Sequence, residues 1–167
     1  MALSKIQSES LNLADNYDFT GTVTGAGVGK VLQVVQATTS SNASTGGPWA
    51  DTGLSAAITL SSSSNKVLIM VTQPITFTIS TSAARYSYMK LLRGSTDLAT
   101  SKQQWDIYIG SFTADNFIYS INYLDSPNTT NATTYKTQFM VSGGTCDIYA
   151  QKGGSSQSQI TLMEIEA

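Results

Sequence analysis

The sequence predicts an all-β domain, built as an antiparallel sandwich or jelly roll. Residues 67–71 are apolar at every position, which indicates a strand that is covered on both faces. Just beyond them, Ile75, Phe77 and Ile79 alternate with hydroxyl side chains, the period-two pattern of a half-buried strand. No segment shows sustained helical periodicity. Short apolar segments separated by glycine and proline breakers are typical of this fold class.

Eight or nine short strands are expected in order from residue 30 onward. Pro74 should interrupt the ladder after the apolar run, and glycines at 94, 110, 143–144 and 153–154 separate the later strands. The turn 125–128 reads Asp-Ser-Pro-Asn, so Asp125 is expected to form a turn and not to bind a ligand. The expected strands cover residues 31–38, 57–60, 67–71 with its continuation 75–79 beyond Pro74, 86–93, 105–109, 117–124, 135–141, 146–150 and 160–165.

Residues 1–29 differ from the rest of the chain. They place four isolated apolar residues in a polar background and end in a glycine-rich stretch, 21–29. Such a segment has too little apolar surface to form a core of its own, so it is expected to order on a partner protein. The chain is therefore divided into an extended anchor and linker, 1–29, and a head domain, 30–167. The anchor candidates are Ile6, Leu11, Leu13 and Phe19.

Composition and charge exclude several classes of function. Charged residues make up 12% of the 167-residue chain, which has a net charge of −2 and no cluster of lysine or arginine. A nucleic-acid partner would require a basic stripe. No apolar run is long enough to span a membrane, and the N-terminus lacks the apolar core of a secretory signal. We expect a soluble protein made in a cytoplasm, with no nucleic acid and no membrane insertion.

Candidate catalytic groups are few, so we expect no enzyme, cofactor or metal. The chain has no histidine and one cysteine, which removes the serine and cysteine triads and any intrachain disulfide. Cys146 begins an alternating strand and is expected in the core. The stretch before Lys30 fails the phosphate-loop spacing. Glu164 and Glu166 are a carboxylate pair of the kind that hydrolyses glycosides, but they are expected to form a solvated strand end.

Aromatic residues offer a weak indication of a contact surface. Tyrosine and tryptophan give large contact area at low entropic cost, and two of them, Tyr86 and Tyr88, should share a strand face. Packing in the core or between subunits is the competing interpretation for these rings. The candidates for host contact, placed on outward-facing loops, are Tyr86, Trp105, Tyr108 and Asn128.

Five stretches resemble structural proteins of phage virions. The opening ALSKIQSESLNLADNY (2–17) and the following FTGTVTG (19–25) resemble the start of tail-fibre-type proteins of marine and cyanobacterial phages. Three later stretches also resemble virion proteins: TL through SNKVLI (59–69), LDSPNTT through ATTY (124–135) and ITLMEI (160–165). None is a catalytic motif, but their order makes the resemblance fairly specific.

The resemblance implies a head similar to the trimeric jelly rolls of the tumour-necrosis-factor and complement type. It further implies a homotrimeric tail fibre or spike component of the virion, attached to another virion protein and directed at a host surface glycan or protein. A trimer would also explain residues 67–71, because one strand face would enter the sandwich and the other would meet a neighbouring subunit. The alternatives are a capsid decoration or head-fibre protein without a receptor role, and a carbohydrate-binding, lectin-like module. A depolymerase is the least favoured.

Overall fold

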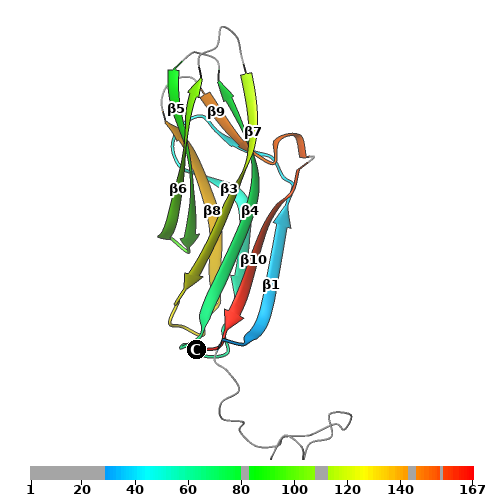
Figure 1. Ribbon diagram of the computed structural model, residues 1–167. Helices are drawn as coiled ribbons and strands as arrows, with labels where there is room; N and C mark the ends of the chain where they lie inside the picture. The colour runs from blue at the N-terminus through cyan, green and yellow to red at the C-terminus, as the bar shows by residue number, and fades with distance from the viewer. Residues whose placement is uncertain (1–28, 80–82, 108–112, 143–145, 155) are drawn as a thin grey trace, which may run out of the picture.

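A computed structural model describes residues 29–79, 83–107, 113–142, 146–154 and 156–167 (Figure 1). This part of the chain forms ten strands, all paired antiparallel, and one short 3-10 turn, η2 (Lys152–Gly154). The predicted all-β class is confirmed. The strands are β1 (Val31–Thr39), β2 (Ala43–Thr45), β3 (Ala50–Ile58), β4 (Lys66–Ile79), β5 (Ala83–Arg93), β6 (Thr96–Ile107), β7 (Thr113–Asp125), β8 (Thr133–Ser142), β9 (Cys146–Ala150) and β10 (Ser158–Ile165).

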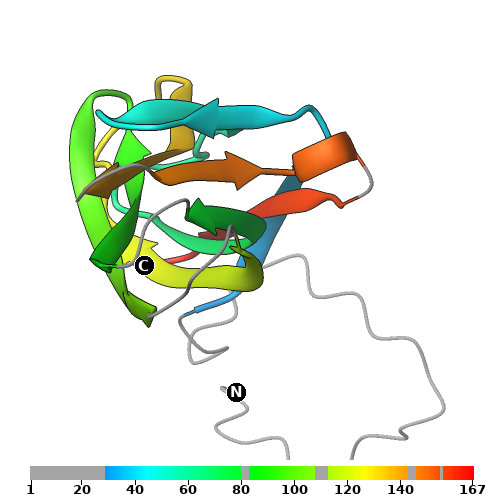
Figure 2. The ribbon, with the colours of Figure 1, turned by 90° about the horizontal axis from the view of Figure 1, so that it is seen from above.

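The strands lie in two sheets that pack face to face (Figures 1 and 2). The larger sheet has the order β1-β10-β4-β9-β2, with β7 on the other edge of β4, and the smaller sheet has the order β3-β8-β5-β6. β10 and β9 pair with successive parts of the same edge of β4, so together they correspond to one interrupted strand. On their other side, β1 pairs with β10 and β2 pairs with β9, so β1 and β2 form a second interrupted strand. The result is the eight-strand connectivity of a jelly roll.

The core lies between the sheets. β4 contributes the inward row Val67, Ile69, Val71, Ile75 and Phe77, each at most 2% exposed. Residues from both sheets complete the cluster, and Cys146 is among them, as the sequence predicted. The largest fully buried partners are Leu54, Met89, Leu91, Tyr135, Phe139, Ile148, Ile160 and Leu162.

Pro74 lies inside β4, which is continuous through it and pairs with β7 along its whole length, so the segments 67–71 and 75–79 form one strand. The predicted break in ladder pairing occurs on one edge only. On the opposite edge, pairing with β10 ends at Thr72 and pairing with β9 begins at Ile75. The Pro74 carbonyl accepts from the Gln151 amide on that edge, at 3.5 Å. Since N–H and C=O of one residue point to the same side of a strand, the missing Pro74 donor falls in the gap between β9 and β10.

Two predicted strands begin too late. β3 starts at Ala50 and not at residue 57, and β6 starts at Thr96 and not at residue 105. The first part of β6, before residue 105, is polar and lies at a sheet edge, so it has no apolar pattern that predicts a strand. Its strand conformation comes from backbone pairing with β5. A two-residue hairpin turn connects β5 to β6. Its Gly94 has a φ of 57°, a conformation that glycine adopts without strain.

The two ends of the sandwich differ. The base is the end at which β1 begins and β10 ends, and the C-terminus lies there (Figure 1). The tip is the opposite end, at which β4 ends and β5 begins. The amide of Gly29 donates to the Glu166 carbonyl, so residues 1–28, which lie outside the described part, join the head at the base. The four anchor candidates lie among them and stay predictions. No helix in the described segments is long and apolar enough to cross a membrane.

Candidate functional site

An apolar row crosses the outer face of the larger sheet near the base. The register pairs Val34 of β1 with Met163 of β10, Met163 with Leu68 of β4, and Leu68 with Leu124 of β7. Four neighbouring strands therefore present an apolar side chain at the same height. Val34 is 57% and Leu124 52% exposed, and Met70, one outward position above the row on β4, is 43% exposed. Exposed apolar side chains grouped in this way mark a contact surface.

Above the apolar row, the central part of this outer face is polar but uncharged. Between the apolar row and the pair formed by Thr76 and Asn116, no outward position of β10, β4 or β7 carries a charged side chain. The strand predicted to be covered on both faces is thus covered by its own subunit on one face only. Its outward residues are Leu68, which is half-buried, and Met70.

A hollow of about 420 Å³ opens on the same face, nearer the tip. Among its described lining residues only Lys152 is charged, and the Lys152 ammonium lies 4.4 Å from the centroid of the Tyr149 ring. Ile118, 64% exposed, forms part of the wall. The other lining residues are Pro74, Ile75, Thr76, Asn116, Phe117 and Ser156.

Glu164 is not a solvated strand end as predicted, because its side chain turns inward at the base and is 1% exposed. Its Oε1 accepts from the Ser61 amide, the Ser61 hydroxyl and Asn65 Nδ2, each at 2.7 Å, and Oε2 accepts from Gln33 Nε2 at 2.5 Å. Glu166 lies outside, in an exposed 3.8 Å ion pair with Lys30. The two carboxylates therefore share no site, and Glu164 ties β1 and the 59–65 loop to β10.

The protonation state of Glu164 follows from these contacts. Burial by itself raises the pKa of a carboxyl group. Here the hydrogen bonds from Asn65, Gln33 and Ser61 outweigh burial and lower the pKa of Glu164 from 4.5 to about 2. The group is therefore ionised at neutral pH without a cation beside it, and its charge is stabilised by four donors.

A second polar cluster at the base joins the two sheets. Arg93 Nη1 lies 2.9 and 2.8 Å from the two carboxylate oxygens of Asp125, and the Tyr135 hydroxyl donates to the same carboxylate at 2.7 Å. Burial, followed by the hydrogen bond to Asp125, raises the pKa of the Tyr135 hydroxyl far above its ordinary value. Asp125 ends β7 and is 6% exposed. Its role is thus to hold β7 to β5 and β8, and it offers no open ligand position.

An aromatic–lysine strip lies on the outer face of the smaller sheet. Tyr86, Tyr88 and Lys90 are successive outward positions of β5, because Ser87 and Met89 between them are buried. The other members are Trp49, just before β3, and Lys102 of β6, which pairs with Tyr88. The Trp49 and Tyr88 rings meet edge to face with centroids 6.3 Å apart, and Tyr86 lies 6.4 Å from Tyr88.

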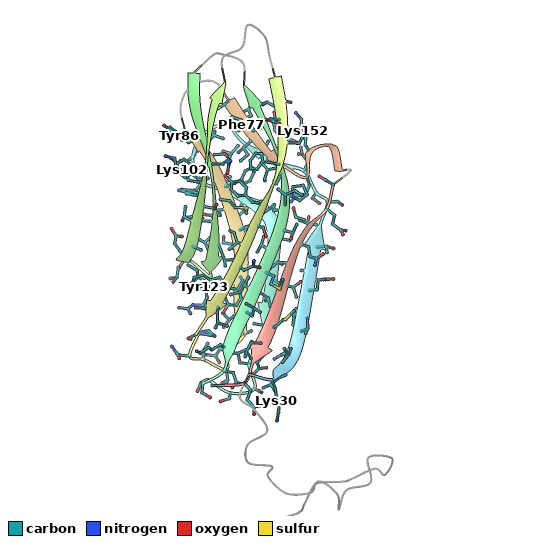
Figure 3. The ribbon with its side chains drawn as sticks, viewed as in Figure 1. Lys30, Phe77, Tyr86, Lys102, Tyr123 and Lys152 are labelled. Atoms are coloured by element: carbon teal, nitrogen blue, oxygen red, sulfur yellow. The ribbon has the colours of Figure 1, made fainter. Side chains whose placement is uncertain are left out.

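Both lysines of the strip lie over aromatic rings. Lys102 Nζ is 3.9 Å from the centroid of the Tyr86 ring and 5.8 Å from that of Tyr88. Lys90 Nζ is 4.6 Å from the Trp49 ring and 3.0 Å from Asp97. Figure 3 shows Tyr86 and Lys102 together on the same side of the sandwich, far from Lys30 at the base.

The predicted host-contact residues do not form one surface. Tyr86 lies on a strand and belongs to the strip. Trp105 is on β6, paired with Arg85 near the tip, its side chain lies outside the described residues, and so does the whole of Tyr108. Asn128 follows β7 at the base, with a φ of 54° that suits its turn. It therefore lies at the end where the chain enters, opposite Tyr86 and Trp105.

Residue-by-residue reasoning missed several members of these surfaces. Trp49 and Lys102 are far from Tyr88 in the sequence, and only strand pairing brings them together. Val34 and Leu124 were assigned to strands but not to a face. The alternation within residues 117–124 does carry a signal for Leu124. It places the Leu124 side chain on the strand face opposite to that of Tyr119 and Tyr123. Within the described residues, no group of three or more possible ligands could hold a metal ion.

No protein-family model matches the sequence, and no curated protein matches it. Solved structures with some similarity include infectious bursal disease virus, Gx strain, with a TM-score of 0.36 and 16% identity over 81% of this chain. A mutant VP2 protein of the same virus, from derived particles, has a TM-score of 0.38 and 16% identity over 92%. The chain spans only 37% and 41% of the length of those chains. The fold assignment rests on the strand topology and not on these scores.

Proposed function

We propose that the chain is a non-enzymatic structural protein of a phage virion, a tail fibre or spike component that acts as a homotrimer. Residues 1–29 attach it to another virion protein, and the head contacts the host surface. The observation that carries the proposal is the apolar row with the uncharged face above it. The virion-like stretches along the sequence supply the biological setting.

A second copy of the same chain is the partner that best suits this face. An interface between copies of one chain must bury whatever charges its surface carries, and a buried charge costs free energy unless an opposite charge meets it. Between the apolar row and the pair of Thr76 and Asn116, the described outward positions of β10, β4 and β7 carry no charge. The smaller sheet, in contrast, carries Lys90, Lys102 and Lys136 and the carboxylates of Asp51 and Asp97. Burying that face between copies would require each of these charges to meet an opposite one.

The two ends of the head then have different tasks. Residues 1–28 join at the base, so the tip is directed away from whatever the anchor binds. Asn128 lies at the base, the end that this proposal turns toward the virion, and its role in host contact stays a prediction. Tyr86 and Trp105 lie toward the tip and remain candidates. Three anchors on one trimer would bind a larger assembly more tightly than one, since the second and third attachments are intramolecular.

Truncation tests the division of labour. A protein starting at Gly29 should fold, because every described strand and the Glu164 contacts lie beyond that residue. We expect it to form the same oligomer as the full chain but to be absent from purified virions of a phage that lacks the full-length copy. A second variant tests the same claim in the full-length chain. It replaces Ile6, Leu11, Leu13 and Phe19 with alanine, and we expect it to lose incorporation as well. Normal incorporation of either protein would show that the head itself carries the docking surface.

The mounting point distinguishes this proposal from a capsid decoration protein. Labelling the protein on intact particles and imaging them should place it on the tail. A label over the capsid would instead support the head-fibre alternative.

A further inference from the structure

We infer that the aromatic–lysine strip binds an acidic saccharide, a sugar chain that carries carboxylate or sulfate groups. The inference deepens the host-contact part of the proposed function and rests on it for its biological meaning. The binding itself is a property of the head and needs no virion.

The strip provides apolar rings at a sheet surface. Trp49, Tyr86 and Tyr88 are all half-buried, so each ring is held by its neighbours while part of it stays accessible. Tyrosine and tryptophan combine a large apolar area with a polar group and lose few rotatable bonds on binding. The C–H faces of a sugar ring are an apolar match to such surfaces, and a tyrosine hydroxyl can exchange hydrogen bonds with sugar hydroxyls.

The two lysines of the strip have different tasks. The side chain of Lys90 is only 12% exposed and is paired with Asp97, so it positions Trp49. Lys102 is exposed and makes no ion pair with any described residue. Contact with the Tyr86 ring orients its ammonium without using up its hydrogen-bond donors. A carboxylate or sulfate on the ligand is the charged acceptor that this ammonium lacks.

A sugar chain fits these features better than a nucleic acid does. A single nucleic-acid strand also stacks on rings, but it brings a phosphate at every nucleotide and needs a positively charged groove. The strip offers one exposed lysine, Lys102, that makes no ion pair within the described part of a chain whose net charge is −2. An open sheet face accepts an extended chain, and one cation suits a ligand with well-spaced charges.

Calorimetric titration of the full-length protein tests the inference. The probes are oligogalacturonate and dextran sulfate as acidic saccharides, uncharged dextran as their neutral counterpart, and oligo-deoxythymidine. We expect at least one acidic saccharide to bind, dextran to bind about tenfold more weakly or not at all, and the acidic saccharide to bind more weakly as salt rises. Binding of neither acidic probe, or tighter binding of the oligonucleotide, would overturn the inference.

Variants locate the site. Lys102→Gln should weaken acidic saccharide binding about tenfold or more, Lys102→Arg should retain most of it, and Trp49→Leu should weaken it by removing the ring. Lys152→Gln is the matched control, because it removes a ring-bound lysine from the other sheet, and should bind as the wild type does. Equal affinity of Lys102→Gln and the wild type would refute the site. If Lys152→Gln alone loses binding, the ligand occupies the hollow instead. The mass of each variant in solution is measured as well, so that a loss of binding is not mistaken for a loss of the oligomer.

Discussion

Replacing Glu164 with alanine should lower the free energy of unfolding by about 3 kcal/mol or more. The substitution leaves donors of Gln33, Ser61 and Asn65 without their acceptor at a buried position, and each unpaired buried group costs about 1–3 kcal/mol. It also removes the side-chain hydrogen bonds that link β10 to Gln33 of β1 and to the 59–65 loop. Denaturant unfolding at one fixed protein concentration measures the change.

Glu166→Ala is the matched control for this experiment. Its carboxylate is exposed and lies 3.8 Å from Lys30, and exposed pairs contribute about 0–1 kcal/mol. We expect its unfolding midpoint to stay close to that of the wild type. If both alanine variants shift the midpoint equally, the buried carboxylate is not the anchor described here.

The Glu164 contribution should also vanish in acid. The pKa of Glu164 is about 2 in the folded protein and 4.5 without the fold's contacts, so the unfolded chain takes up the proton first as pH falls. The stabilisation, about 3 kcal/mol by this difference, is fully present above pH 4.5 and is lost progressively as pH falls toward 2. The stability gap between wild type and Glu164→Gln should narrow over that range. A gap that is constant with pH would contradict the assigned charge.

Aspartate at two adjacent positions of β4 should produce two different failures. Ile69 is fully buried, and an unpaired charge there costs several kcal/mol, so Ile69→Asp should prevent folding of the subunit. Met70 points outward and is 43% exposed. Met70→Asp should leave the β-sheet circular dichroism of the subunit intact but weaken the oligomer about 100-fold or more, because every subunit would bury the new charge.

Ser55→Asp controls for the added charge itself. Ser55 is exposed on β3, in the smaller sheet, and its aspartate variant should keep the wild-type mass. The contact assignment fails if Met70→Asp keeps that mass at micromolar concentration, or if Ser55→Asp dissociates as readily.

The apolar pattern carried most of the information about the fold. Residues 67–71 and the alternation after them placed β4, which pairs with three other strands and contributes the central row of the core. The pattern could not show that Pro74 lies within one continuous strand, because the gap that tolerates it is made by β9 and β10. It missed the early part of β6, whose strand conformation comes from pairing with β5.

The surfaces were less accessible to sequence reasoning than the fold. Tyr86 was identified from its residue type, but its partners Trp49 and Lys102 come from other strands. Asn128 was grouped with Tyr86 because both looked exposed, and only the topology places them at opposite ends. Glu164 looked like a solvated strand end, since its four donors come from β1 and the 59–65 loop and are invisible in a local window.

The mass of the protein in solution tests the central claim most directly, namely that the apolar row on the outer face of the larger sheet joins three subunits. Sedimentation equilibrium of the full-length chain at micromolar concentration should give three times the mass of one subunit, and the same multiple should hold for the protein that starts at Gly29. A stable monomer under these conditions would contradict the account, because the apolar row of Val34, Met163, Leu68 and Leu124 would then remain exposed to water.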